Sequence, residues 1–171
     1  VSSGRWFSGK SAEDRYIIQG SLILLGHYRG LIDGVFGKNT FQAIVDYERE
    51  NNLRPDGILT SQQEVELHEQ AAAVYHFLGF QGEIDSRTGI TAPVPTRLFA
   101  INRPAKWGTH WENADGSIEM ETLAVPQSVT TFAGLYKRLS GGNRTIDYSV
   151  LKDSFFVLSG RIGIRNFYTA V

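Results

Sequence analysis

One segment, Tyr28–Thr40, constrains the fold more than any other, because it separates two stretches of helical period and carries three glycines. Gly30, Gly34 and Gly37 supply positive φ angles or a close backbone approach, which other residues adopt only with strain. Apolar residues alternate with these glycines, so we expect the loop to fold back on its flanking helices; they are Leu31, Ile32, Val35 and Phe36. Apolar loops with so many backbone-setting glycines typically position functional groups.

The segment before this loop has a clear helical period. Ile18, Leu22 and Leu25 recur at i, i+4 and i+7, which predicts an amphipathic helix over residues 12–25. Gly26 follows as a stop signal.

Two further helices are predicted after the loop. Asn39 or Thr40 can cap a second helix that runs to about residue 51. A turn at residues 55–57, Pro-Asp-Gly, separates it from a third helix over residues 60–78, whose start carries a capping box. We therefore predict an all-α three-helix bundle over residues 12–72.

A family resemblance is carried by glycines, an aspartate and apolar residues that keep their order and spacing across both turns. These residues are Leu25, Gly26, Tyr28, Gly30, Ile32, Asp33, Gly34, Phe36, Gly37, Thr40, Ala43, Ile44, Tyr47, Leu53, Asp56, Gly57, Leu59 and Thr60. With them, residues 12–70 resemble the peptidoglycan-binding domain attached to many bacterial cell-wall hydrolases. The resemblance implies a three-helix bundle that holds stem peptide or glycan in a shallow surface groove. One position departs: the family usually has an aromatic residue followed by Gln where this chain has Tyr47-Glu48, and a charge there could weaken or redirect a sugar contact.

The loop and the second helix offer groups that suit such a ligand. Backbone N–H groups of glycine-bearing turns can meet carboxylates or amide carbonyls, and a tyrosine edge can lie against a sugar face. Asp33 has an alternative role, in which its carboxylate caps loop amides and touches no ligand. We predict the peptidoglycan-binding residues to be Tyr28, Arg29, Asp33, Gly34, Asn39, Thr40, Gln42 and Tyr47.

The segments around this bundle have weaker patterns. Residues 1–11 are rich in Ser and Gly and are expected to form an extended lead-in that Trp6 and Phe7 pin to the body. Residues 73–96 read as a connector, because prolines disfavour helix immediately before them and suggest an extended entry into the next segment.

The hydrophobic period changes from 3.6 to 2 after residue 96. Short alternating segments predict strands at 98–101, 107–111, 118–122, 145–151, 154–159 and 165–170, and a helical period predicts one helix at 128–140. Short connections favour antiparallel pairing. We therefore predict an α+β domain with an antiparallel sheet and one packed helix over residues 97–171, and an α+β class for the whole chain. This part resembles no family, and because the sequence stops within a predicted strand, we expect the parent protein to continue past Val171.

Composition excludes several function classes. A net charge of −1 gives no support to nucleic acid or an anionic membrane as the main partner. The absence of cysteine excludes disulfides and thiolate metal sites, and no apolar run approaches the roughly 18 residues that span a bilayer. We predict no cofactor and no metal, and a location in the periplasm or at the cell wall.

Catalytic signals are weak. His110 and Asp115 could in principle join a serine such as Ser159 in a hydrolytic triad, but no Gly-x-Ser-x-Gly motif is present. Glu119 and Glu121 could mimic a glycosidase pair, yet the solvated face of a strand has the same pattern. We predict no catalytic residue.

These observations favour a noncatalytic bacterial protein that binds peptidoglycan or its muropeptides and carries an accessory α+β domain. That domain could contact another envelope protein. Two alternatives remain: a targeting fragment of a cell-wall-modifying enzyme whose catalytic part lies elsewhere, and a protein-interaction module that has lost peptidoglycan binding.

Overall fold

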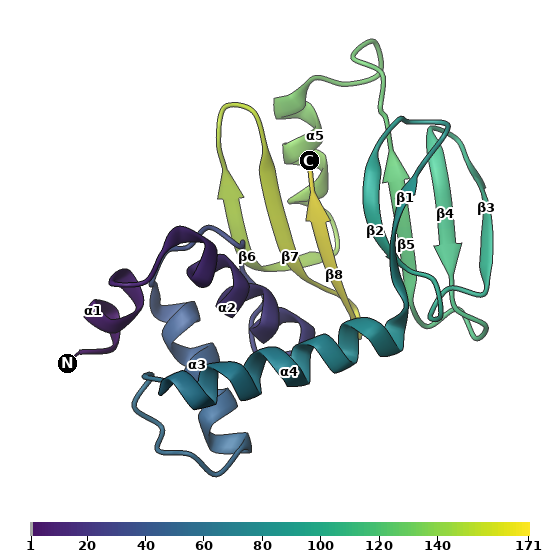
Figure 1. The fold of residues 1–171 in the computed structure, drawn as a ribbon. Coiled ribbons are helices and arrows are strands. Elements are labelled where there is room, and N and C mark those ends of the chain that lie inside the picture. Colours follow the sequence, from purple (N-terminus) through teal and green to yellow (C-terminus); the bar gives the residue numbers. More distant parts are fainter. Residues whose placement is uncertain (1) are drawn as a thin grey trace. The chain divides into compact units, whose positions relative to one another are not determined.

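The computed structural model describes residues 2–171, and within that range it contains five helices and eight strands (Figure 1). Helices dominate up to Leu78 and antiparallel strands follow, which confirms the predicted α+β class. Among these residues, no helix combines the length and the apolar character that a membrane crossing requires.

The chain divides into two compact units that are not consecutive in sequence. The first comprises residues up to Ala72 together with Leu135–Val171, and the second comprises Ala73–Gly134. The sequence predicts consecutive domains at 12–72 and 97–171, with a connector between them. The difference arises because periodicity defines local elements and carries no information about which distant segments pack together.

Four helices begin the chain: α1 (Ser3–Ser8), α2 (Ala12–Leu24), α3 (Lys38–Glu50) and α4 (Ser61–Leu78). The last three confirm the predicted helices. The Thr60–Gln63 capping box at the start of α4 is also present, with each backbone N–H bonded to the other side chain. The predicted cap of α3 is wrong, since Gly37 occupies the cap position and no side chain bonds there.

Helix α1 replaces the expected extended lead-in. The Ser2 hydroxyl caps it by accepting from Arg5 N–H, and the Phe7 side chain is fully buried. Lys10 then donates to Glu64 Oε1 at 2.6 Å, which ties the segment to α4. Burial of an aromatic ring favours a short helix that Ser and Gly content alone would not predict. The expected role of Phe7 as an anchor is confirmed.

The buried side chains of these helices form one core, to which the loop between α2 and α3 also contributes. Its buried members are Phe7, Ile18, Leu22, Tyr28, Ala43, Ile44, Tyr47, Leu59 and Leu67. The apolar faces predicted from the helical period therefore face inward, as the hydrophobic effect requires.

A fully buried amide holds the loop between α2 and α3. Gln19 Oε1 accepts from the N–H groups of Asp33 and Gly34, at 3.0 and 2.8 Å. Its Nε2 lies 3.1 Å from Asp33 Oδ1 and 3.3 Å from Thr40 Oγ1 and Val35 O. Gly34 is buried with a φ of +68°, so this turn needs glycine. One side chain of α2 thus fixes the course of the whole loop.

A buried carboxylate holds the second turn in a similar way. Glu48 is 1% exposed, and its two oxygens accept from the N–H groups of Gly57 and Ile58 at 2.8 and 3.0 Å. The expectation that a charge at this position alters a sugar contact is therefore wrong, because the side chain is directed into the fold. A carboxylate offers two acceptor oxygens to two donors, whereas an amide offers one.

Three strands complete the first unit: β6 (Arg144–Leu151), β7 (Phe156–Ile162) and β8 (Arg165–Ala170). They pair antiparallel in the order β6-β7-β8. The antiparallel pairing predicted for these strands is confirmed.

The second unit holds two small antiparallel sheets. One is a hairpin of β1 (Phe80–Ile84) and β2 (Thr91–Pro95), and the other has the order β3 (Ile101–Ala105), β4 (Gly108–Glu112), β5 (Glu119–Leu123). Residues 80–95 are thus not a plain connector. Proline is tolerated in β2 because both strands of a two-stranded sheet are edges.

Other details after residue 96 also differ from the prediction. The strands form separate sheets instead of one, and the strand expected at 98–101 begins at Ile101. Helix α5 (Phe132–Leu139) starts four residues later than expected, where the Thr131 hydroxyl accepts from Gly134 N–H. The turns at 96–99 and 126–130 shorten both elements.

A second buried carboxylate joins the two sheets of this unit. Asp85, in the β1–β2 turn, accepts from Thr109 Oγ1 of β4 at 2.9 Å and from Thr122 Oγ1 of β5. Thr88 Oγ1 and Arg87 N–H also donate to it. These hydrogen bonds, with that of Thr122 foremost, hold the pKa of Asp85 at about 2.

We expect Gln19→Ala to destabilise the first unit by about 2–4 kcal/mol, because the buried Gly34 N–H and its Asp33 neighbour lose their acceptor. Amide hydrogen exchange should also accelerate over residues 31–36. Urea unfolding and exchange mass spectrometry measure the two effects. The matched control is Gln62→Ala, which removes an exposed glutamine bonded only to Glu66 and should change neither. Unchanged exchange in the loop would show that other contacts hold it.

We expect Glu48→Ala to cost about 2–4 kcal/mol of unfolding free energy, because two turn N–H groups lose their acceptor. Burial raises the pKa of Glu48 above its ordinary value of 4.5. The folded state therefore binds the carboxyl proton of Glu48 more tightly than the unfolded chain does. The contribution of Glu48 to the unfolding free energy is largest below pH 4.5 and falls as pH rises through the raised pKa. Urea unfolding of both proteins across this range measures the difference.

Glu69→Ala serves as the control for this series, since Glu69 is an exposed glutamate of α4. It should leave stability unchanged at every pH. A gap between the original protein and Glu48→Ala that widens with rising pH would contradict the assigned direction of the shift.

Candidate functional site

A cavity of about 580 Å³ lies in the first unit. Its lining comes from the end of α2, the following loop, the start of α3 and the strands β6–β8. The residues are Ile23, His27, Tyr28, Arg29, Gly30, Asn39, Gln42, Ala43, Asp147, Tyr148, Ser159, Gly160, Asn166, Phe167 and Tyr168. Its volume falls within the range of about 300–1,000 Å³ that is usual for small-molecule sites.

Four of the eight predicted binding residues line this cavity: Tyr28, Arg29, Asn39 and Gln42. Arg29, Asn39 and Gln42 are exposed. Because Gly37 caps α3, the Asn39 side chain is not used as a helix cap. Gln42 donates to Asp46 Oδ1 at 2.8 Å along the same helix. The structure thus brings three polar side chains together at one wall of the cavity.

Tyr28 contributes to this wall differently from the expectation. The residue is buried, and its hydroxyl donates to Leu31 O at 2.9 Å, so its polar end is directed into the loop. Burial is the main cause that raises the pKa of Tyr28 to about 12, which keeps the hydroxyl neutral. Tyr28 therefore offers the cavity an aromatic surface.

Three other predicted residues lie in the loop network and do not line the cavity. Asp33 Oδ1 accepts from Val35 N–H at 2.9 Å and from Gln19, which is the capping role weighed from the sequence. Thr40 is buried and donates to Val35 O at 2.9 Å. The Gly34 N–H is bonded to Gln19. These residues shape the loop that carries Tyr28 and Arg29.

Tyr47, the last of the eight, is fully buried in the helical core. Its hydroxyl has no hydrogen-bond partner among residues 2–171, and its ring lies edge-on to that of His27 at 5.9 Å between centroids. Burial raises its pKa. Tyr47 supports the cavity wall through His27 and offers no surface to a ligand.

The opposite wall, formed by β6–β8, contains residues that sequence reasoning missed. The Tyr148 hydroxyl accepts from Leu31 N–H at 3.2 Å, and Ser159 Oγ donates to Arg29 O at 3.4 Å. These two bonds connect the sheet to the loop. The alternation of residues 145–151 and 165–170 predicted the strands, but no local signal indicates which segment their exposed faces meet.

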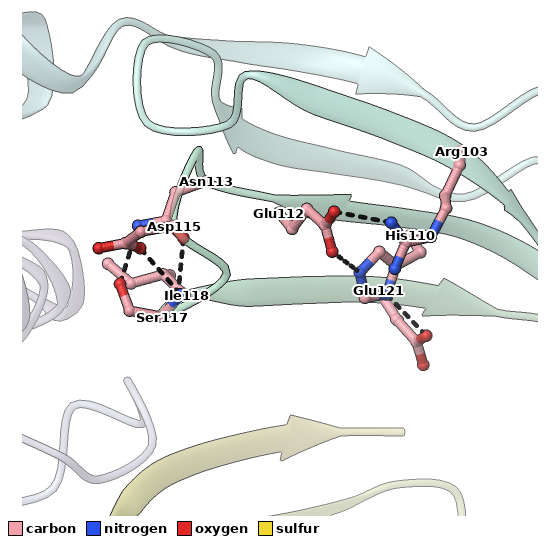
Figure 2. A network of polar contacts seen from close by, with 8 residues as sticks. All are labelled: Arg103, His110, Glu112, Asn113, Asp115, Ser117, Ile118 and Glu121. Carbon is pink, nitrogen blue, oxygen red and sulfur yellow. Dashed lines mark hydrogen bonds and ion pairs between the residues drawn. The ribbon is translucent and has the colours of Figure 1, made fainter.

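A separate polar network lies on β3–β5 in the second unit (Figure 2). His110 Nδ1 lies 2.9 Å from Glu121 Oε1, and His110 Nε2 lies 3.1 Å from Glu112 Oε2. The bond to Glu121 is the main cause that raises the pKa of His110. Arg103 in turn bonds Glu112 Oε1 at 2.7 Å, and this pairing lowers the pKa of Glu112.

This network does not form the hydrolytic arrangement considered from the sequence. Both ring nitrogens of His110 face carboxylates, so neither is available to take a proton from a hydroxyl. Asp115 instead accepts from Ser117 N–H in the turn between β4 and β5, which Figure 2 shows beside the His110 cluster. The hairpin turn between β4 and β5 thus accounts for Asp115.

Comparison with known proteins identifies one segment. A family described as the putative peptidoglycan binding domain matches residues 11–64, and neither a curated protein nor a solved structure matches the chain. The match supports peptidoglycan binding and cell-wall association in general. It covers α2, the loop, α3 and the beginning of α4, whereas β6–β8 lie outside it. Residues 11–64 are thus similar to the peptidoglycan-binding domain family, which is the resemblance that their glycines and apolar residues predicted.

Proposed function

We propose that the protein binds peptidoglycan without catalysing a reaction, and that the cavity of the first unit is the binding site. One observation carries this proposal: the matched segment supplies the wall on which four predicted residues lie side by side. The other four predicted residues act indirectly, by holding the loop or filling the core.

The side chains on this side of the cavity suit a fragment of peptidoglycan. Arg29 can donate to a carboxylate or carbonyl, and the amides of Asn39 and Gln42 can both donate and accept. The Tyr28 ring, which lines the cavity, can lie against an apolar sugar face. An open site of this kind buries little ligand surface, so we expect weak binding to each site and stronger retention on polymeric peptidoglycan.

The location and the role of the second unit follow from the same proposal. A peptidoglycan ligand places the protein in the bacterial envelope, in the periplasm or at the wall. Residues 73–134 are then free to contact another envelope protein while the first unit tethers the chain. The His110 network supports a noncatalytic role, because its only histidine has both nitrogens occupied.

We expect the 171-residue chain to sediment with purified insoluble peptidoglycan. The triple variant Arg29→Ala, Asn39→Ala and Gln42→Ala should reduce the bound fraction at least about tenfold, since each lost hydrogen bond contributes about 0.5–1.5 kcal/mol. A sedimentation titration measures the apparent Kd. Its matched control replaces three exposed polar residues outside the cavity, Arg54→Ala, Asn143→Ala and Gln62→Ala.

Two outcomes would contradict the proposal. If the original chain stays in the supernatant, the segment is better explained as a protein-interaction module. If incubation releases soluble muropeptides, the protein modifies the wall as well as binding it. Melting curves of both triple variants show whether a loss of binding reflects a loss of fold.

A further inference from the structure

We propose that strands β6–β8 complete the binding cavity, and that the completed site takes an uncharged N-acetylated sugar segment of the glycan strand, not the carboxylate-bearing stem peptide. This inference rests on the proposed function and names the part of the ligand. The residues that carry it lie outside the segment that matches the family.

The strand wall presents a row of three hydroxyl-bearing side chains. Tyr148 of β6 pairs in register with Ser159 of β7, which pairs in turn with Tyr168 of β8. Side chains of directly opposed residues share one face of an antiparallel sheet. Two tyrosines therefore flank a small serine on the face that lines the cavity. Because the serine is smaller than the two tyrosines, the surface between the rings is a shallow depression with aromatic sides, where a ligand can lie.

Tyr168 has a ring surface that is free to meet a ligand. Its side chain is 56% exposed although it lines the cavity, whereas Tyr148 is half-buried and bonded to the loop. Asn166 precedes Tyr168 by two residues on the same strand, so both side chains lie on the same face. Aromatic faces bind the apolar C–H surface of a sugar, and a neighbouring amide can bond its substituents.

The charges of the lining favour an uncharged ligand. Among the lining residues that the structure describes, Arg29 is the only arginine or lysine and Asp147 is the only carboxylate, so the two formal charges cancel. His27 Nε2 lies 3.6 Å from Glu50 Oε2, so a carboxylate also accompanies the histidine of the lining. A stem peptide carries several carboxylates, and a site for it would be expected to concentrate positive charge.

The polar groups of the two walls match the substituents of an N-acetylated sugar. Asn39 and Gln42 stand on α3 and Asn166 stands on β8, so amides reach the cavity from both sides. Each amide can donate to one oxygen and accept from another, which suits hydroxyl and acetamido groups. The cavity of about 580 Å³ has room for a short oligosaccharide.

Hydrogen bonds between the walls make this site preformed. Leu31 N–H to Tyr148 and Ser159 Oγ to Arg29 O are direct contacts between the loop and the sheet. A ligand that enters between them does not have to order either wall, which reduces the entropic cost of binding.

The test is a titration of the 171-residue chain with two separate probes: a tetramer of N-acetylglucosamine and a free stem peptide. We expect the tetramer to bind and the peptide not to bind. Tyr168→Ala and Asn166→Ala should each weaken tetramer binding about 2- to 10-fold, from the lost ring contact and the lost amide bond. Changes in NMR amide shifts over residues 27–42 and 147–168 report binding to both walls.

Matched controls are Tyr75→Ala, a partly exposed tyrosine of α4, and Asn143→Ala, an exposed asparagine, neither of which lines the cavity. Both should bind like the original chain. If Tyr168→Ala lowers the melting temperature, Asn166→Ala still tests the strand wall, because its side chain is exposed.

The outcomes separate this inference from the proposed function. Sedimentation with intact peptidoglycan combined with peptide binding and no tetramer binding would overturn the sugar assignment and leave the function intact. Tetramer binding that both strand variants leave unchanged would overturn the role of β6–β8. If the chain binds neither probe nor the intact polymer, both proposals fail.

Discussion

The buried amide of Gln19 is the interaction on which the first unit depends. A loop with a left-handed glycine and a polar aspartate cannot satisfy its own backbone groups, and Gln19 supplies the missing acceptor from a fully buried position on α2. Its Nε2 also lies near Asp33 Oδ1 and Val35 O of the loop and near Thr40 Oγ1 of α3. Because one buried side chain holds residues 33–35 and Thr40, the second half of the loop is fixed to the helical core.

The elements of the fold could largely be predicted, because a helical or alternating period is a local property. The three helices after residue 11 and the three last strands appear where the period placed them. Helix α1 could not be predicted, since its six residues carry no period and depend on the burial of Phe7. The hairpin at 80–95 was not predicted because proline argues against a strand, and it is tolerated here only because the strand lies at an edge.

The candidate site could be predicted only in part, because the sequence does not show which polar residues are exposed and which are buried. Asn39 and Gln42 lie on α3, where their exposure follows from the helical period, whereas Arg29 lies in the loop and its exposure follows from its charge. Residue type alone does not distinguish Tyr47 from a tyrosine that binds a ligand. Its position on the inner face of α3 buries it completely. Glu48 resembles a surface charge in sequence, but two turn N–H groups require its carboxylate inside. Side-chain chemistry alone does not distinguish these roles.

The family segment provides one wall of the cavity, and a sheet more than 100 residues away along the chain provides the other. Contacts between segments so far apart in the sequence cannot be inferred from local patterns. A single helical wall offers a flat surface, where hydrogen bonds compete with water. An opposing row of Tyr148, Ser159 and Tyr168 lines the other side of the same cavity and adds aromatic surface to it. The lining of the cavity therefore comes from both the matched segment and the last three strands, and the proposed site depends on both.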